Sequence, residues 1–457
     1  MTVEIFITTK TKVLKVLQVL NHFLPQQIAG TEIYTWMLSK HLKHSDIEVK
    51  IIIPNYGKAH SEEYEYDELV VHKFEETSVI DRKLIMGYKE SNGLQFFKKY
   101  IENTNPDIIH FHELAGSNGI SLKHVIAAKQ NGAKVIFTFH LASYTCKTGS
   151  LVFKEKELCT GIIDLKKCAS CYLQSKGNPK FNFFLNSGSN ILFKLNIDST
   201  KWNNKVGTAL GTYYLISNLQ YNFKTLIEHC DKVVVLTNWY KNILLLNGVP
   251  ENKIKLISQG LTFSSVHSLN QTNSKSDFKK TIRLIFLGRI SFFKGLHILI
   301  DAVMCLPKNS VTLNIYGQDD DSEYGTLLKE KSKSFANIIW QGKLQQNNVF
   351  ETLQKNDVLC LCSTFSEMSP LVIQEAFAAG IPVLASNVYG NAEQITHNYN
   401  GWLFKFKDVT YLSTQLQLLI DNPSLIEEAK KNIKPPRNFD AVAKEQLEVY
   451  KEVLSAV

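Results

Sequence analysis

No run of apolar residues in this chain reaches the roughly 18–20 residues that a helix needs to cross a membrane. The first fifteen residues also lack the basic and then apolar segments that are typical of a secretory signal peptide. We therefore expect a cytoplasmic protein without a membrane-spanning helix. At 457 residues the chain is long enough for two domains, each with a core of its own.

Arginine is absent from residues 141–229, although this segment contains eleven Lys and five acidic residues and so holds most of the net charge of +8. Because Arg reads bases and phosphates through its forked donors, its absence argues against a zinc-based nucleic-acid binder, and we expect no nucleic-acid partner. Either the segment faces an anionic lipid surface or an acidic acceptor, or it is a solvated basic face. Its aromatic-rich part, 181–226, fits helices that contact a membrane peripherally at its inner face, or ordinary core packing.

Short apolar runs alternate with helical patterns along most of the chain. Strands are predicted at 13–21, 49–53, 107–111, 135–139 and 231–236, and a second series follows at 281–287, 311–316, 358–361 and 383–386. Residues 264–280 are rich in Ser, Asn and Lys without aliphatic periodicity, which predicts a linker. We therefore expect an α/β protein with a first domain over 1–263, interrupted by an insertion at about 141–229, and a second domain over 281–438.

One stretch, 362–383, combines two carboxylates with a well-marked helix. Ser369 is a suitable N-cap, Pro370 suits the first helical position, and Gly380 suits a left-handed helix stop. The helix then starts between Glu367 and Glu375, and its free N–H groups and positive dipole end form an anion site. A carboxylate on each side of a phosphate site is the layout that a nucleotide-sugar requires, since ionised carboxylates accept hydrogen bonds from vicinal hydroxyls.

This pattern resembles the E-x7-E motif of retaining glycosyltransferases of family four, which have the GT-B fold. The resemblance implies two Rossmann-like domains with parallel sheets facing each other across a cleft, the first binding the acceptor and the second the nucleotide-sugar. It also implies that a C-terminal helix, 439–457, returns to the first domain. By the same resemblance Glu375 holds the ribose, Glu367 contacts the donor sugar, and backbone N–H groups at Ser369 and Leu371 lie near the diphosphate.

The loop after the first strand of the second domain carries two cations. Gly288 and Arg289 follow the strand end, and Lys294 and a second glycine follow five residues later. Such a loop supplies charge and close backbone approach for a diphosphate. It is similar to the G-R-x(3-4)-K-G loop of the family, so Arg289 and Lys294 are expected to neutralise the leaving nucleotide without a catalytic metal. We interpret the D-x-D match at 319–321 as a solvated loop.

Three further positions are assigned by the resemblance alone. His140 ends a strand and matches the histidine of a T-x-H-D segment that contacts the donor sugar, although Leu141 replaces the aspartate. Gly30 matches the second glycine of a P-x(3)-G-G-x-E loop, in which Ala29 replaces the first. Glu393 matches a G-x-x-E segment that closes the nucleotide pocket.

Four cysteines gather within 26 residues of the insertion: Cys146, Cys159, Cys168 and Cys171. The C-x-x-C spacing of the last two is typical of zinc sites, and the segment has few aliphatic residues for a core of its own. We therefore predict a structural zinc held by four thiolates. Reduced free thiols and a disulfide pair are the alternatives, the latter disfavoured in a reducing cytosol.

These observations predict a retaining, metal-independent hexosyltransferase that takes its sugar from a UDP- or GDP-sugar. The acceptor is expected to be a glycan, a lipid-linked sugar or a protein, as in polysaccharide biosynthesis. No residue stands out as a nucleophile, so the resemblance implies front-side attack with the leaving phosphate as base. A phosphorylase is disfavoured because no lysine site for pyridoxal phosphate is visible. A nucleotide-sugar-binding subunit without activity is the remaining alternative.

Overall fold

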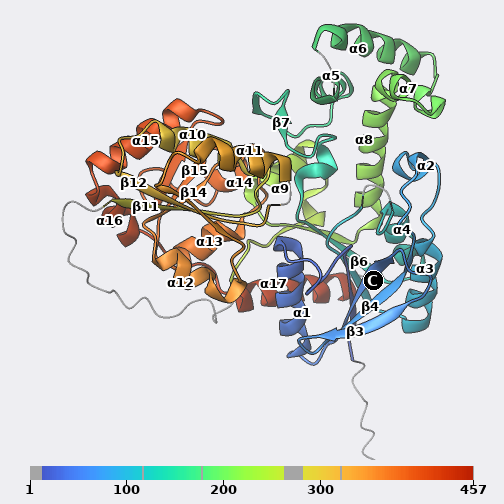
Figure 1. Ribbon diagram of the computed structural model, residues 1–457. Coiled ribbons are helices and arrows are strands. Elements are labelled where there is room, and N and C mark those ends of the chain that lie inside the picture. Colours follow the sequence, from blue (N-terminus) through green and yellow to red (C-terminus); the bar gives the residue numbers. More distant parts are fainter. Residues whose placement is uncertain (1–12, 116–117, 177–178, 262–280, 320–321, 456–457) are drawn as a thin grey trace, which may run out of the picture. The chain divides into compact units, whose positions relative to one another are not determined.

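The computed structural model describes residues 13–115, 118–176, 179–261, 281–319 and 322–455. The chain divides into two compact units (Figure 1). Unit 1 comprises residues 1–138, 225–233 and 443–457, and unit 2 comprises residues 139–224 and 234–442. The predicted linker, 264–280, lies outside the described residues.

Unit 1 is built on a mainly parallel sheet. Its strands are β1 (Lys15–Val19), β2 (Glu48–Tyr56), β3 (Glu62–Tyr66), β4 (Leu69–Glu76), β5 (Ile108–Phe111) and β6 (Lys134–Phe139). They are ordered β6-β5-β1-β2-β4-β3, and β9 (Lys232–Val235) and β10 (Ile254–Leu256) extend the sheet beyond β6. The pairs β1–β2, β1–β5, β2–β4 and β5–β6 are parallel, whereas β3–β4 is antiparallel. The central strands β1, β5 and β6 are mainly apolar, and they are buried apart from the first residues of β1 and β6, as expected for a parallel sheet covered on both faces.

The helices of unit 1 connect these strands, and the last helix of the chain joins them. They are α1 (Gly30–Lys43), α2 (Arg82–Ile85), α3 (Gly93–Thr104), α4 (Leu122–Gln130) and the greater part of α17 (Phe439–Ser455). The Tyr450 hydroxyl of α17 forms a hydrogen bond with His110 Nδ1 at 2.8 Å and accepts a second one from Gln18 Nε2 at 3.2 Å. Because all three side chains are fully buried, this network ties the C-terminal helix to β1 and β5.

Unit 2 begins with the insertion. This part contains η1 (Ala142–Thr145), the hairpin β7 (Val152–Phe153) and β8 (Glu157–Leu158), α5 (Leu165–Lys176), α6 (Pro179–Lys194), η2 (Ser199–Trp202), α7 (Lys205–Leu210) and α8 (Thr212–His229), whose last five residues belong to unit 1. Residues 139–224, which hold most of the insertion, group with residues 234–442. Two hydrogen bonds link the insertion to the rest of unit 2: Ser366 N–H donates to the Ser150 carbonyl at 2.9 Å, and the Lys407 side-chain Nζ donates to the Glu155 carbonyl at 3.0 Å.

The second sheet of unit 2 is fully parallel. Its order is β13 (Ile338–Gly342), β12 (Val311–Tyr316), β11 (Ile282–Leu287), β14 (Val358–Leu361), β15 (Val383–Ser386) and β16 (Gly401–Phe404). Further helices of unit 2 are α9 (Asn238–Leu246), η3 (Glu251–Lys253), η5 (Phe292–Lys294), α10 (Leu296–Met304), α11 (Ser322–Ser332), η6 (Gln346–Asn348), α12 (Val349–Gln354), α13 (Leu371–Ala378), α14 (Tyr389–Ala392), α15 (Val409–Asp421) and α16 (Ser424–Lys431). Successive residues of β11 enter different cores, Leu284 and Phe286 on one face and Ile285 on the other.

The helix α13 starts one residue later than its sequence indicated. Pro370 is the N-cap, with extended backbone at ψ 119°, and its carbonyl accepts from the Ile373 N–H at 3.2 Å. Ser369 therefore does not cap the helix, and Leu371 is its first residue. The other end is as predicted, because Gly380 has φ +74° and so adopts the left-handed conformation that ends a helix.

None of the helices in the described ranges has the length and apolarity of a membrane span.

Candidate functional site at the strand ends of unit 2

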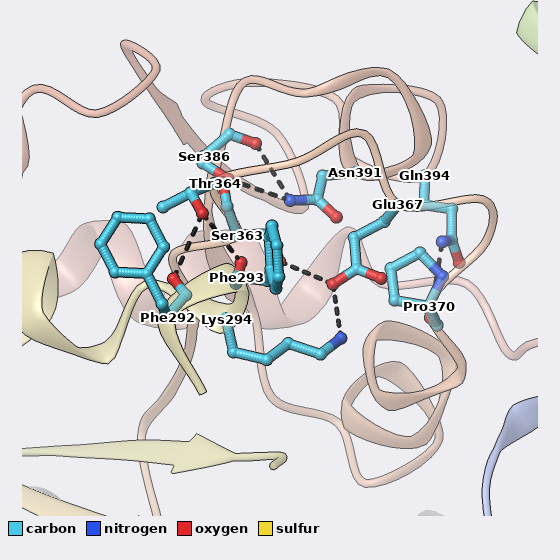
Figure 2. A network of polar contacts seen from close by, with 10 residues as sticks. All are labelled: Phe292, Phe293, Lys294, Ser363, Thr364, Glu367, Pro370, Ser386, Asn391 and Gln394. Carbon is cyan, nitrogen blue, oxygen red and sulfur yellow. Dashed lines mark hydrogen bonds and ion pairs between the residues drawn. The ribbon is translucent and has the colours of Figure 1, made fainter. Parts of the chain in front are cut away.

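The loop between β14 and α13 places Glu367 against Lys294. Glu367 Oε1 accepts from Lys294 Nζ at 2.5 Å and from the Ser363 hydroxyl at 2.7 Å (Figure 2). Glu367 is 7 % exposed and Ser363 is 1 % exposed, so the Glu367 carboxylate and the hydroxyl that donates to it are shielded from bulk water. The structure thus brings together two predicted site residues that stand 73 positions apart in the chain.

Backbone contacts fix the two loops that carry this pair. Thr364 N–H donates to the Phe293 carbonyl at 2.8 Å, and its hydroxyl contacts the carbonyls of Phe292 and Phe293 (Figure 2). Gly295, which follows Lys294, has φ +68°, and a Cβ there would overlap the Cys362 carbonyl. Only glycine meets both demands, so Gly295 positions Lys294 through the backbone.

The far side of the Glu367 loop packs against α14. The Ser386 hydroxyl donates to the Ser363 carbonyl at 2.9 Å, and Asn391 Nδ2 donates to the Ser386 carbonyl at 3.1 Å. A Cβ on Gly390 would overlap the Glu367 carbonyl and would lie 2.8 Å from the Met368 carbonyl oxygen. Close backbone packing therefore determines where Glu367 stands.

Glu375 lies within α13, apart from the Lys294–Glu367 pair. It is half-buried, and its Oε1 accepts from Gln346 Nε2 at 3.1 Å. Burial raises the pKa of the Glu375 carboxyl, and the Gln346 hydrogen bond partly opposes this effect. A carboxylate held by a side-chain amide at the surface of a helix is one that a ligand hydroxyl can engage by replacing the amide.

Arg289 and Gly288 follow β11, on the strand end that leads to Lys294. The Gly288 N–H donates to the Tyr316 carbonyl at 3.1 Å, which ties this turn to β12. Arg289 is exposed, whereas Lys294 is only 18 % exposed. The two predicted phosphate-binding cations therefore differ in environment, one at the surface and one inside the loop cluster.

Glu393 is engaged by the protein itself. Its carboxylate accepts from the backbone N–H groups of Asn238 at 2.7 Å and Trp239 at 2.9 Å, in the first turn of α9. Acidic groups stabilise the positive end of a helix, so these bonds are favourable. Glu393 and Ser369 also line a cavity of about 380 Å³, together with Thr237 and Gln374.

His140 lies directly after β6 and is buried, with 8 % exposure. Burial lowers its pKa to about 3, so the imidazole is neutral near pH 7. A neutral histidine offers one N–H donor and one acceptor nitrogen, which suits hydrogen bonding to a sugar hydroxyl and not charge neutralisation.

Gly30 is the first residue of α1 in unit 1, and open space surrounds the position of an added Cβ. Two residues on, Glu32 is 1 % exposed and accepts from Gln27 Nε2 at 2.7 Å. Burial raises the pKa of Glu32 to about 7. Its burial at a helix start sets Glu32 apart from surface acids.

A polar cluster of unit 1 escaped the sequence analysis. The Asn21 N–H donates to Glu113 Oε1 at 2.8 Å, and Asn21 Oδ1 accepts from Tyr56 Oη at 3.3 Å and from the Ile120 N–H at 2.9 Å. Asn21, Tyr56 and Glu113 stand at or just after the carboxyl ends of β1, β2 and β5, where ligands bind in open α/β sheets. The sequence signal that could have indicated this cluster is a polar residue at or just after the end of each apolar run.

The predicted zinc site is not supported. No group of three or more His, Cys, Asp or Glu side chains in the described ranges is arranged to hold a metal ion, and all four cysteines are free. Cys171 Sγ instead accepts from the Lys154 N–H at 3.2 Å, and Cys146 Sγ lies 3.2 Å from the Thr148 hydroxyl. Burial, and then the neighbouring thiols, raise the pKa of Cys168 to about 11, which favours a protonated thiol.

Asp320 and Asp321 of the D-x-D match lie outside the described residues.

Comparison with known proteins places this arrangement in a family. A model described as "Glycosyl transferases group 1" matches residues 270–435, and a model described as "Glycosyltransferase Family 4" matches residues 28–156. An uncharacterised glycosyltransferase of Methanocaldococcus jannaschii is 26 % identical over 51 % of this chain and 61 % of its own length. A Campylobacter jejuni N-acetylgalactosaminyltransferase, whose name specifies an undecaprenol-diphosphate-linked acceptor, is 26 % identical over 43 % of this chain and 55 % of its own length. The match thus spans little more than half of these relatives.

Solved structures share the fold over nearly the whole chain. Sucrose-phosphate synthase of Thermosynechococcus elongatus superimposes with a TM-score of 0.68 and 15 % identity, covering 97 % of this chain and 100 % of that one. The Anabaena protein HepE, solved in complex with UDP and glucose, gives a TM-score of 0.61 and 14 % identity, covering 96 % and 100 %. These likenesses confirm the predicted GT-B fold. Because the two family models together cover well over half of the sequence, the chain belongs to the glycosyltransferases of family four.

Proposed function

We propose that this protein is a retaining glycosyltransferase that moves a hexosyl group from a UDP- or GDP-sugar to a glycan or lipid-linked acceptor. The observation that carries the proposal is the buried Lys294–Glu367 pair, placed between the end of β11 and the start of α13. A cation and a carboxylate, the latter on the loop that leads into the start of α13, offer the groups that a diphosphate and a sugar need. HepE, with the same fold, was solved with UDP and glucose, which supports a donor of this class.

Each residue has a defined part in this proposal. Lys294 and Arg289 neutralise the donor diphosphate, and the amides at the start of α13 add donors to its oxygens. Lys294 leaves Glu367 when the phosphate arrives, which frees the carboxylate to accept from sugar hydroxyls. Glu375 exchanges its Gln346 contact for the ribose hydroxyls. The neutral His140 adds a further hydrogen bond to the sugar.

The reaction balances without a protein nucleophile. The bond between the anomeric carbon and the diphosphate oxygen breaks, and its electron pair stays on that oxygen. The acceptor hydroxyl forms the new bond on the same face of the sugar, and its proton passes to the departing phosphate oxygen. Charge therefore develops on the diphosphate, where fixed cations and helix amides stabilise it most effectively. In this scheme Arg289 and Lys294 carry out the neutralisation that a catalytic metal provides in other enzymes.

A panel of nucleotide-sugars in a thermal-shift assay identifies the donor, and turnover of that donor tests the site. Lys294→Ala and Glu375→Ala are each expected to lower turnover about a hundredfold or more. Lys333→Ala and Glu351→Ala are matched controls, because both side chains are exposed elsewhere in unit 2. Wild-type turnover in both site variants would remove the assignment. The inactive-subunit hypothesis instead predicts donor binding by the wild-type chain without product.

We further propose a peripheral contact between α6 and an anionic lipid surface, with the protein on the cytoplasmic side. Phe181, Phe183 and Phe184 of this helix are 64 %, 76 % and 71 % exposed. Lys194, in the last turn of the same helix, is also exposed. Apolar side chains together with basic ones are typical of helices that lie in a membrane interface.

Sedimentation with phosphatidylglycerol vesicles tests this contact. Phe183→Ser/Phe184→Ser is expected to reduce the bound fraction, because it removes two aromatic side chains from the proposed interface. Leu327→Ser is the control, since Leu327 is 65 % exposed on α11. Equal binding of all three proteins would refute the contact.

A further inference from the structure

A cavity of about 300 Å³ lies between the insertion and the loops of the candidate site. One wall comes from the insertion, through residues such as Thr148 and Tyr172. The opposite wall includes Phe292 and Phe293, which directly precede Lys294, and Thr364, three residues before Glu367. The cavity therefore adjoins the loops that carry the proposed donor site. We refer to it as the lysine pocket.

The lysine pocket is strongly basic. Four of its lining residues are lysines and one is acidic: Lys147, Lys154, Lys176, Lys407 and Glu155. The backbone carbonyl of Glu155 accepts from Lys407 Nζ at 3.0 Å. Within the described ranges, Lys147, Lys154 and Lys176 have no carboxylate within ion-pair distance. Cations gathered around a cavity without paired acids repel one another, so an anion bound there is stabilised.

The pocket wall is held in shape by the fold. Lys154 and Glu155 form the turn between β7 and β8, with φ of +52° and +62°. The Lys154 N–H donates to Cys171 Sγ at 3.2 Å, which attaches this turn to α5. Lys407 also has positive φ, +58°, just after β16. Three segments distant in sequence thus present their lysines around one cavity.

The other lining groups fit a sugar. Phe292 and Phe293 are 51 % and 56 % exposed, so their rings are available for contact with a ligand. The hydroxyls of Thr148, Ser150 and Ser175 add donors and acceptors. The volume is at the lower end of the range for small-molecule sites, which accommodates a phosphate with one sugar ring.

We propose that the lysine pocket binds the phosphate or diphosphate group of the acceptor substrate, next to the donor site. This inference rests on the proposed transferase function. Phosphate is the anion favoured here, because it accepts from several ammonium groups at once and carries more charge than a carboxylate. Two sources share this chemistry, a lipid-linked sugar diphosphate and a soluble sugar phosphate.

The first test uses inorganic pyrophosphate as the probe, titrated calorimetrically into the full chain after saturation with UDP. UDP occupies the donor cations, so further binding reports on other sites. The test variant is Lys154→Asn/Lys176→Ala, with Asn chosen because it tolerates the positive φ at position 154. The control is Lys156→Ala/Lys166→Ala, which removes the same charge from exposed positions of the insertion.

Loss of two charge-assisted contacts is expected to weaken pyrophosphate binding by about a hundredfold in the test variant, while the control stays near wild type. Equal weakening in both variants would show a general charge effect and overturn the proposal, as would unchanged binding in both. Circular-dichroism melting curves establish whether the variants are folded. If the double test variant is not folded, Lys176→Ala alone replaces it, and its affinity for pyrophosphate is expected to fall about tenfold.

Two further arms identify the source of the phosphate. Glucose 1-phosphate represents soluble acceptors, and phosphatidylcholine vesicles containing a polyprenyl diphosphate represent lipid-linked ones. Weaker binding of either probe by the test variant supports the pocket and names the source, whereas unchanged binding of both contradicts it. If the wild-type chain binds UDP but not pyrophosphate, the lysine pocket fails while the proposed function stands. If it does not bind any nucleotide-sugar, the proposed function fails first.

Discussion

Removing Lys294 isolates the pair on which the proposed site depends. The side chains of Lys294 and Glu367 are 18 % and 9 % exposed, and their charged atoms lie 2.5 Å apart. In Lys294→Ala the Glu367 carboxylate keeps the Ser363 hydroxyl as a donor but loses its only described cationic partner. A nearly buried carboxylate is then left without charge compensation, and unfolding becomes easier because the unfolded chain hydrates that charge.

The size of the effect follows from this burial. Breaking a buried ion pair costs about 3–5 kcal/mol, and the partial exposure of Lys294 puts the expected loss of unfolding free energy near 3 kcal/mol. For a unit as long as unit 2, with an unfolding entropy of about 2.1 cal/mol/K per residue, that corresponds to a melting temperature lower by roughly 5 °C. Lys294→Met/Glu367→Gln removes both charges while preserving volume and a partner for Ser363. Most of the lost stability is therefore expected to return in the double variant.

Activity separates a structural role from a functional one. Thermal melts and donor turnover are measured for Lys294→Ala, Glu367→Gln, the double variant and Lys333→Ala, whose exposed ion pair should contribute at most about 0.5 kcal/mol. We expect the double variant to be stable yet to lose at least a hundredfold in turnover, because Lys294 no longer neutralises the leaving diphosphate together with Arg289. Turnover that recovers together with stability would refute a catalytic role for the pair. An unchanged melting temperature in Lys294→Ala would refute the structural reasoning.

Three other perturbations probe the surroundings of the site. Gly390→Ala forces the Glu367 backbone to move, so we expect about 1–3 kcal/mol of destabilisation and a large loss of turnover. Gly342→Ala is the control, because Gly342 has positive φ but open space around an added Cβ. It should lose about 1 kcal/mol of stability and keep its activity. Burial raises the pKa of Glu32 from 4.5 to about 7, so its contribution to stability is present below pH 4.5 and is lost as the pH rises through 7. Glu32→Gln should therefore raise the melting temperature at pH 8 relative to wild type but not at pH 4, while the exposed Glu102→Gln should change neither. Glu393→Ala removes the acceptor at the start of α9 and should cost about 1 kcal/mol in chemical denaturation, and no change would show that solvent replaces it.

Local sequence signals predicted the elements around the site well. The apolar run before Cys362 predicted β14, and the stop at Gly380 and Pro382 predicted where α13 ends and β15 begins. These predictions held because strand patterning and left-handed helix ends depend on a few adjacent residues. The start of α13 was off by one residue. Pro370 and Ser369 are both acceptable at an N-terminus, and the extended backbone of Pro370 decided between them.

Amino-acid order alone determined the alternation of strands and helices, the glycine-flanked cation loop after β11 and the two acids around α13. Tertiary structure decided which of these groups meet: Lys294 with Glu367 across 73 positions, the insertion with unit 2, and four lysines from separate segments around one cavity. It also decided that the four cysteines do not converge on a metal site in the described ranges. The physical reason is that backbone preference acts over a few residues, whereas side-chain proximity depends on how distant segments pack.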